Sequence, residues 1–323
     1  MGLLVLFAAA YGVLLALMVG GVLWQMNRPR RKTLGVSLAM GGPGDPADLE
    51  MIGREVTFNL ADATGSPGWI IDGRRADGPV AVVVHGHRDS RYGSLYRAQM
   101  LLPYTSAVVV FDLPGHGDAE AGSCRMGGRE ARDVWAVIQG LDRDWLGGRP
   151  IVLLGYSMGA VIAVKAAAEG PDDDDAPALS GLIACAPYRF WDEGLRGQMA
   201  RRSLPQFPAV ALVGLALSIA AKLDPRGWGL GLAPGFDVAA WAGKVDIPTL
   251  VLHGDADRIC PLSAGRAVAD AAPLGRLVVI PGGTHNQLLA AGYDQVHEAL
   301  AGFFADLGPE PAPAADDIST PSA

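Results

Sequence analysis

Cysteine is scarce in this chain of 323 residues, and its three cysteines, Cys124, Cys185 and Cys260, lie far apart. An odd number at wide spacing, without any Cys-x-x-Cys pair, argues against a disulfide framework. We therefore expect three thiols packed in a core, in a reducing compartment.

Charge is scarce as well, and no basic surface stands out. Only 19% of the residues are charged, the net charge is -8, and the basic residues are scattered apart from one cluster. Proteins that bind nucleic acids usually concentrate Lys and Arg on one face, so we exclude that class. Half of the residues are hydrophobic, which suffices for one catalytic-sized domain with attachments.

The N-terminus lacks charge altogether from Leu3 to Trp24, a run of 22 residues. A helix of this length crosses a hydrocarbon core of ~30 Å. Secretory signals usually begin with basic residues and end at a small-residue cleavage site, and neither is present here. The sequence thus predicts an uncleaved transmembrane anchor over residues 1–26, with a cleaved export signal as the alternative.

A basic and Gly/Pro-rich linker is expected next, over residues 27–50. It begins with a cluster formed by Arg28, Arg30, Arg31 and Lys32. Because positive charge favours the cytoplasmic side of a membrane, this cluster predicts a single-pass protein of the cell membrane with its catalytic domain in the cytoplasm.

Beyond residue 50, short apolar runs typical of buried strands alternate with segments of helical periodicity. This alternation predicts the α/β class, with a mostly parallel sheet and helices on both faces. In such sheets, functional residues gather at the carboxyl ends of the strands. Strands are expected at 54–61, 68–71, 80–84, 107–112, 150–155, 181–186, 248–254 and 276–283, and helices at 94–102 and 129–141.

The segment Leu-Leu-Gly-Tyr-Ser-Met-Gly-Ala at 153–160 joins an expected buried strand to a helix of small residues. It matches the Gly-x-Ser-x-Gly pattern of a nucleophile elbow, in which the serine occupies a tight, strained turn. Bulk at Gly155 or Gly159 would collide with neighbouring backbone. The pattern alone is weak evidence, but the order of strand, turn and helix makes Ser157 the candidate nucleophile.

A serine nucleophile needs a base and an orienting acid, and this kind of fold takes them from later strand ends in the order Ser, Asp, His. The run Thr-Leu-Val-Leu-His-Gly-Asp-Ala-Asp ends one expected strand and presents Asp255 and Asp257. The next expected strand ends in Pro-Gly-Gly-Thr-His and presents His285. His285 is the candidate general base, and either aspartate remains open as the acid.

The chain resembles the α/β-hydrolase superfamily over about residues 51–307. Four blocks carry this resemblance: His-Gly-His-Arg-Asp-Ser, Phe-Asp-Leu-Pro-Gly-His-Gly-Asp-Ala-Glu, Gly-Tyr-Ser-Met-Gly, and the two strand ends above. The resemblance is greatest to the serine aminopeptidase and monoacylglycerol-lipase-like branch and its membrane-anchored relatives. It implies an α/β-hydrolase core over 51–187 and 244–307. It also implies that Asp257 is the triad acid and that Asp255 is a turn or capping residue.

The alternation of His85, His87 and Asp89 suggests a metal site as another possibility. The comparison is with the His-x-His-x-Asp-His signature of metallo-β-lactamase-like hydrolases. Ser90 stands where that signature requires histidine, and the chain shows no second cluster of ligands. We therefore expect neither a metal nor a cofactor.

A different role for the same turn follows from the resemblance. It implies that the backbone N–H groups of His87 and Met158 form the oxyanion hole, one from the loop after the strand and one from the residue after the nucleophile. His116 is expected to pack a loop beside the site.

A cap is expected over residues 188–243, where insertions in this fold cover the active site. It contains an apolar run of 15 residues, 207–221, which is too short to cross a bilayer. The run is either a lid packed over the site or a lid that also enters the membrane interface, where nearby arginines would meet anionic head groups. Residues 308–323 are expected to be a disordered tail.

Together these features predict a membrane-anchored serine hydrolase that cleaves an acyl ester, thioester or amide through an acyl-enzyme. Its expected partners are the membrane and a small-molecule acyl or lipid-like substrate. The alternatives are an acyltransferase or peptidase on the same scaffold, or a catalytically silent membrane-attached binding protein.

Overall fold

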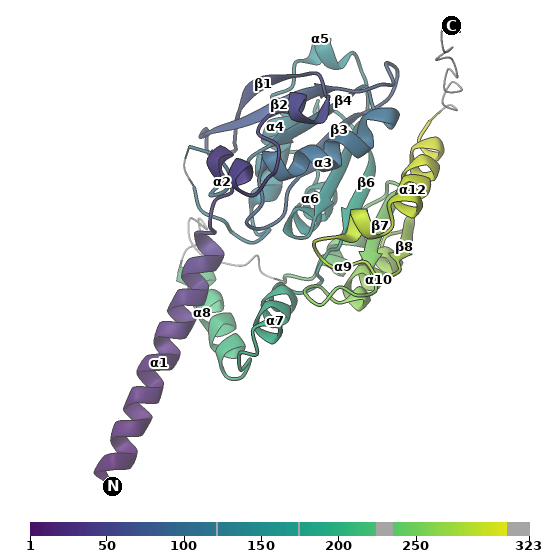
Figure 1. Cartoon of the computed structure of the whole chain (residues 1–323). Helices are drawn as coiled ribbons and strands as arrows, with labels where there is room; N and C mark the ends of the chain where they lie inside the picture. Colours follow the sequence, from purple (N-terminus) through teal and green to yellow (C-terminus); the bar gives the residue numbers. More distant parts are fainter. Residues whose placement is uncertain (121, 174, 224–234, 309–323) are drawn as a thin grey trace, which may run out of the picture.

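A computed structural model describes the chain except for residues 121, 174, 224–234 and 309–323 (Figure 1). Its core is an eight-stranded sheet in the order β1-β2-β4-β3-β5-β6-β7-β8. β2 runs antiparallel to both of its neighbours, and all the other pairs are parallel. The strands are β1 Gly53–Asn59, β2 Gly65–Asp72, β3 Val80–Val84, β4 Ala107–Phe111, β5 Ile151–Tyr156, β6 Leu179–Cys185, β7 Thr249–Gly254 and β8 Gly275–Ile280.

The central strands are buried along their whole length, and this explains their composition. Every residue of β3, β4 and β5 is buried, and most are Val, Ile or Leu. A parallel sheet with both faces covered requires such continuous apolar strands rather than alternating ones. The predicted α/β class with a mostly parallel sheet is confirmed.

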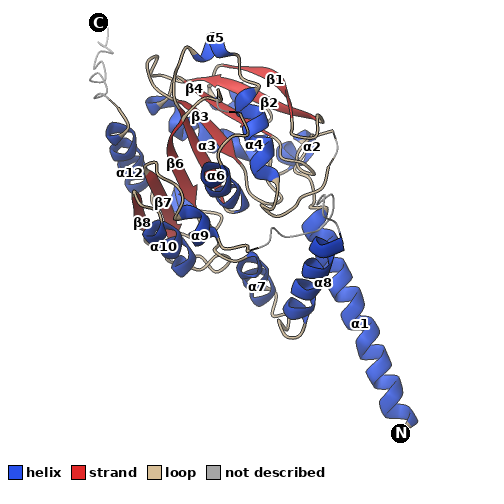
Figure 2. Cartoon of the chain, turned by 180° about the vertical axis from the view of Figure 1, so that it is seen from behind, coloured by secondary structure: helices blue, strands red, loops and turns tan. Residues whose placement is uncertain are grey.

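Helices cover both faces of this sheet (Figure 2). One apolar cluster joins the sheet to α3 and α12, and another joins the opposite face to α4, α6, α9 and α10. The bounds are α3 Arg91–Leu101, α4 Glu130–Gln139, α6 Met158–Glu169, α9 Val238–Ala242, α10 Leu262–Ala271 and α12 Tyr293–Asp306. Shorter elements are α2 Leu34–Ala39, η1 Pro46–Leu49, η2 Leu102–Tyr104, α5 Arg143–Leu146 and α11 Leu288–Ala291.

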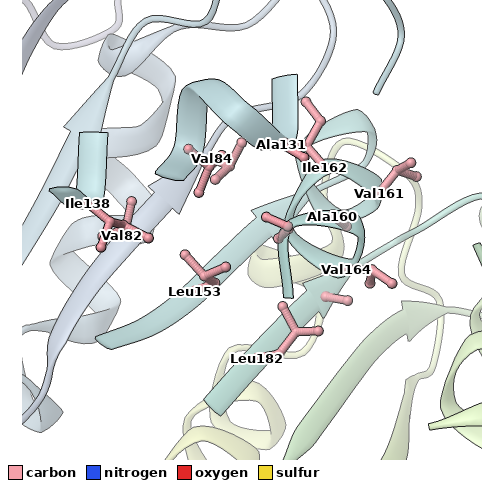
Figure 3. Packing of buried hydrophobic residues seen from close by; sticks show 14 of the residues in the cluster. Val82, Val84, Ala131, Ile138, Leu153, Ala160, Val161, Ile162, Val164 and Leu182 are labelled. Atoms are coloured by element: carbon pink, nitrogen blue, oxygen red, sulfur yellow. The ribbon is translucent and has the colours of Figure 1, made fainter. Parts of the chain in front are cut away.

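Helix α6 packs tightly on the centre of the sheet. Its residues Ala160–Ala163 are fully buried and lie over Val84, Leu153 and Leu182 from three adjacent strands (Figure 3). The small side chains of α6 allow this close approach. The packing holds the first turn of α6 firmly at the carboxyl ends of β3 and β5.

Helix α1, Gly2–Asn27, projects from the body of the protein (Figure 1). Its length and composition would suffice to cross a membrane, although a signal sequence shares both features. All residues up to Leu14 are exposed, whereas its second half packs against α8, Ala209–Leu223. Helix α7, Trp191–Arg201, connects this pair to the core, and both views show α8 beside the base of α1 with α7 on the other side of α8.

The segment 27–50, predicted to be a linker, is docked on the core. The N–H of Cys124 donates to the carbonyl of Asn27 at 2.8 Å, and the Arg31 guanidinium donates to the carbonyl of Ala119 at 2.7 Å. Lys32 forms a 3.3 Å ion pair with Asp89. Apart from Gly308, the predicted tail at 308–323 lies outside the described residues.

Candidate active site

Ser157 occupies the turn between β5 and α6. Its backbone has φ 54° and ψ -117°, a conformation that L-residues rarely adopt and that is typical of strained functional turns. Its N–H donates to the carbonyl of Cys185 at 2.8 Å, which ties the turn to the end of β6. The turn therefore presents the Ser157 side chain at the carboxyl edge of the sheet.

Two glycines make this turn possible. A Cβ at Gly155 would lie 2.2 Å from the carbonyl oxygen of Gly159, and a Cβ at Gly159 would lie 2.0 Å from the carbonyl oxygen of Val84. Both are far inside van der Waals contact, with rigid backbone on the other side. The close approach of α6 to β3 and β5 thus accounts for both glycines.

The turn after β8 brings His285 to Ser157. His285 Nε2 lies 3.0 Å from Ser157 Oγ, and His285 Nδ1 lies 2.7 Å from Asp257 Oδ2. The Asp257 side chain is 1% exposed and that of His285 is 12% exposed, so the pair is largely shielded from water. Three residues from three strand ends therefore form one hydrogen-bonded chain.

Asp257 is held in its charged form. Burial raises the pKa of its carboxyl, but the hydrogen bond and charge of His285, with the amides of Ile259 and Cys260, outweigh burial and leave the pKa below its usual value. Those two amides donate to Oδ1 at 2.8 and 2.9 Å. Oδ2 is thereby left to accept from His285.

Asp255, the other candidate acid, faces away from His285. Its Oδ1 accepts from the N–H of Gly282 at 2.7 Å, and its residue is exposed. It joins the turn after β7 to the turn after β8. The structure thus brings Asp257 to the histidine and gives Asp255 a turn-stabilising contact.

The loop after β3 lies directly against the nucleophile. A Cβ at Gly86 would be 3.4 Å from Ser157 Cβ, so His87 follows at the same edge. Within the described part of the chain, neither the N–H of His87 nor that of Met158 donates to a backbone carbonyl. Met158 begins α6, where the first N–H groups have no partner within the helix. Both amides are therefore available as donors.

The neighbouring residues His85 and Asp89 have separate structural roles. His85 is fully buried, its Nδ1 lies 2.8 Å from the Gly86 carbonyl, and its Nε2 accepts from the N–H of Leu113 at 3.0 Å. Asp89 pairs with Lys32 and, at 2.9 Å, with Arg97. The alternating pattern of the sequence therefore does not converge on one site.

Tyr156, for which the sequence predicted no role, helps to hold His285 in place. Its hydroxyl donates to the backbone carbonyl of His285, and the Arg97 guanidinium lies 4.3 Å from its ring centroid. It occupies the variable second position of the Gly-x-Ser-x-Gly pattern, so nothing in that pattern identifies it.

Helix α7, which lies within the predicted cap, approaches the loop that carries Asp257. A Cβ at Gly197 of α7 would lie 2.3 Å from the carbonyl oxygen of Ile259, which shows how closely α7 approaches residues 258–259. Part of the predicted cap, 224–234, lies outside the described residues. The boundaries of the cap at 188–243 stay a prediction.

Comparisons with known proteins agree with this architecture. The profile of the alpha/beta hydrolase family matches residues 81–301. An esterase of Pyrococcus furiosus superimposes with a TM-score of 0.64 at 20% identity, over 88% of this chain and 99% of that one. An esterase of a Rhodococcus species does so with a TM-score of 0.55 at 20% identity, over 79% and 99%. At such identities these structures show the same fold.

Similar curated proteins include an esterase and a magnesium-chelatase subunit. A pimeloyl-[acyl-carrier protein] methyl ester esterase of Chromobacterium violaceum is 28% identical over 252 residues, which cover 69% of this chain and 93% of that protein. A magnesium-chelatase 30 kDa subunit of Rhodobacter capsulatus is 26% identical over 250 residues, covering 67% and 84%. The resemblance to the aminopeptidase and monoacylglycerol-lipase-like branch stays a prediction.

Proposed function

Because the chain belongs to the alpha/beta hydrolase family, we propose that it is a membrane-attached serine esterase that acts through an acyl-enzyme. The observation that carries this proposal is the hydrogen-bonded chain from Ser157 through His285 to Asp257, with distances of 3.0 and 2.7 Å. The esterases among its relatives act on ester substrates, which supports hydrolase chemistry here.

His285 is the general base in this proposal. A carboxylate on Nδ1 places the N–H on that nitrogen and leaves the lone pair of Nε2 facing Ser157 Oγ. As Oγ attacks the substrate carbonyl carbon, its proton passes to Nε2. The resulting imidazolium is stabilised by ionised Asp257 and then protonates the leaving group.

The oxyanion that forms in this step needs donors placed in advance. The free amides of His87 and Met158 flank Ser157 and supply them. Water then attacks the acyl-enzyme, with His285 again acting as base, and the acid is released. Transfer to an acceptor other than water would share the first half of this sequence and differ only in the product.

Attachment to a membrane through α1 is supported by how the cap sits beside this helix. Met26 of α1 is buried against Val213 and Leu217 of α8, while Leu15 and Met18 pack near Val210. Only residues 2–14, roughly 20 Å of helix, project free of the cap. A full crossing of the ~30 Å hydrocarbon core would therefore bring the first turns of α8 into the membrane as well.

The outer surface of the cap suits such a position. Phe207 is 85% exposed, and Leu215 and Ile219 of α8 are also exposed. Arg201 and Arg202 lie exposed at the C-terminal end of α7, where long side chains would reach phosphate head groups. A site beneath a cap in contact with lipid favours an acyl-chain or lipid-like ester as substrate.

Labelling with a fluorophosphonate tests the nucleophile. We expect the purified full chain in detergent to be labelled on Ser157, and we expect Ser157→Ala to be unlabelled, inactive and as stable as the wild type. Ser218→Ala is the matched control, because Ser218 lies on the exposed surface of α8. Labelling that persists in Ser157→Ala, or a folded wild type that neither labels nor cleaves any ester, would refute the proposal.

A further inference from the structure

Beside the oxyanion loop, the fold brings together three side chains that can bind a metal. His87 follows β3, and His116 and Cys124 lie in the long connection between β4 and α4. One ligand atom from each, a ring nitrogen or Cys124 Sγ, lies within 4.8 Å of the other two. His116 and Cys124 are buried, and His87 is partly buried.

Both histidines have a buried ring nitrogen without a hydrogen-bond partner. In His116, Nδ1 lies 3.0 Å from the carbonyl of Pro114; because a carbonyl only accepts, Nδ1 carries the proton and Nε2 the lone pair. Among the described residues, Nε2 of His116 and Nε2 of His87 have no partner. His85, which stacks edge-on against His116, uses both of its ring nitrogens. A buried polar atom without a partner is destabilising, so these two nitrogens call for an explanation.

Two methionine sulfurs lie near Cys124, the third proposed ligand. Cys124 Sγ lies 3.5 Å from the sulfur of Met158 and 3.8 Å from that of Met126. Thiolates and thioethers are soft ligands, and they favour copper(I) over hard cations such as Mg²⁺ or Ca²⁺.

We propose that His87, His116 and Cys124 form a binding site for a soft monovalent metal ion, Cu(I). On binding, the S–H bond of Cys124 breaks, its proton leaves to solvent, and a sulfur–copper bond forms without any transfer of electrons. One thiolate, two neutral imidazoles and one Cu(I) form a neutral complex, whereas the same ligands with Zn²⁺ carry a charge of +1, which the nearby Glu130 could offset. The choice of Cu(I) therefore rests on the soft sulfur donors.

The position of this site links it to the oxyanion hole. Cys124 touches the side chain of Met158, whose N–H is a proposed oxyanion donor, and His87 supplies the other donor. The proposed ligand Cys124 is also hydrogen-bonded to the end of α1, because its N–H donates to the backbone carbonyl of Asn27. Metal binding itself does not depend on the proposed esterase activity, and it can be measured without a substrate.

Silver(I) is a redox-stable probe for such a site. We would titrate the full chain in detergent with silver nitrate in chloride-free buffer, following stoichiometry by native mass spectrometry and proton release by calorimetry in buffers of different ionisation enthalpy. We expect one ion per chain with release of one proton, because the thiol of Cys124 donates to the sulfurs of Met158 and Met126 and must lose its proton when the sulfur–metal bond forms. Anaerobic titration with Cu(I), in competition with bicinchoninate, should give the same stoichiometry.

Cysteine variants assign the site. Cys124→Ser should weaken binding more than about tenfold, since even partners outside the ligand shell are worth 10–100-fold in affinity. Cys185→Ser is the matched control, because Cys185 is equally buried but lies on β6 away from the cluster. His116→Gln provides a second variant should Cys124→Ser fail to fold, as judged by thermal melting. A wild type that binds no Ag(I) or Cu(I), or equal loss in Cys185→Ser, would overturn the proposal.

Discussion

At the scale of single residues, the two aspartates after β7 have different surroundings, and only one of them contacts His285. Asp257 is buried, accepts two backbone N–H groups on one oxygen and meets His285 with the other. Asp255 lies two positions earlier and is exposed. Asp255 therefore contacts the turn after β8 through Gly282, whereas Asp257 contacts His285.

Replacing the acid should separate these roles. We expect Asp257→Asn to lower kcat by about 10⁴-fold, because an amide on Nδ1 favours the wrong imidazole tautomer. Asp255→Asn should change kcat less than about threefold and cost at most about 1 kcal/mol of stability. Hydrolysis of a short soluble ester, with thermal melting of each variant, measures both. Equal losses of kcat would show that Asp257 does not orient the base.

Another buried carboxyl, Asp133 on α4, makes stability depend on pH. Burial, with the neighbouring charge of Glu130, raises the pKa of Asp133 to about 7. Between about pH 4 and pH 7 the folded state therefore holds a proton that the unfolded chain has released. Its contribution to stability is full at low pH and is lost as the pH rises through 7.

We accordingly expect Asp133→Asn to flatten the decrease of Tm between pH 5 and pH 8. The amide cannot ionise, yet its oxygen can still accept from the N–H of Ala61, as Oδ1 does at 3.1 Å. Asp270→Asn, at an exposed position on α10, is the control and should leave the profile unchanged. Thermal melting of the three proteins between pH 5 and pH 8 tests this. The prediction is wrong if Tm falls equally with pH in Asp133→Asn and in the wild type.

At the scale of elements, the active site depends on how closely α6 approaches the sheet. The helix begins at Met158, its small residues pack on three strands, and this packing leaves no room for a side chain at Gly159. The strained turn at Ser157 therefore depends on the close packing of α6 against the sheet.

A glycine pair tests this dependence. Gly159→Ala places a Cβ 2.0 Å from a backbone oxygen, and we expect it to cost about 3 kcal/mol or more, or to prevent folding. Gly194→Ala, in α7 with nothing within 4 Å of the added carbon, should stabilise its helix by about 0.5–1 kcal/mol. Urea denaturation of both variants gives the comparison. A stable and active Gly159→Ala would mean that α6 packs less closely than the structure shows.

At the scale of the whole molecule, α1 combines an exposed half with a packed half. Residues 2–14 are free of the body, whereas Met26 lies buried against α8 and Asn27 is bonded to Cys124. Helices α1 and α8 and the loop that carries Cys124, beside the candidate active site, are thus joined by one continuous set of contacts, and Figures 1 and 2 show α1 and α8 side by side.

Two truncations distinguish these halves. Deleting residues 2–14 should reduce membrane attachment and leave Tm unchanged, while deleting residues 1–26 should also uncover Val213 and Leu217 and cost about 2 kcal/mol or more. Both products should still cleave small soluble esters, because none of the deleted residues belongs to the proposed catalytic groups. Vesicle flotation, melting and ester hydrolysis provide the readouts. A folded but inactive product would show that α1 forms part of the site.

Much of the fold and of the candidate site could be predicted because it depends on residues that are close together in the sequence. Apolar runs predicted every strand to within a few residues, since burial of a parallel strand requires continuous apolar composition. Glycines at a strand-to-helix turn predicted Ser157 as the nucleophile, and strand-end patterns predicted His285 as the base. The choice of Asp257 over Asp255 needed a family resemblance, because both follow the same strand.

By itself, then, the sequence determined the class of fold, the nucleophile elbow and an apolar N-terminal helix, since periodicity and turn chemistry depend on neighbouring residues. Only the tertiary structure decided that α8 lies along α1 and that His87 and His116 meet Cys124. These contacts join segments that are distant in the chain and carry no local pattern. They depend on how the whole set of helices and loops packs around the sheet, which no short window specifies.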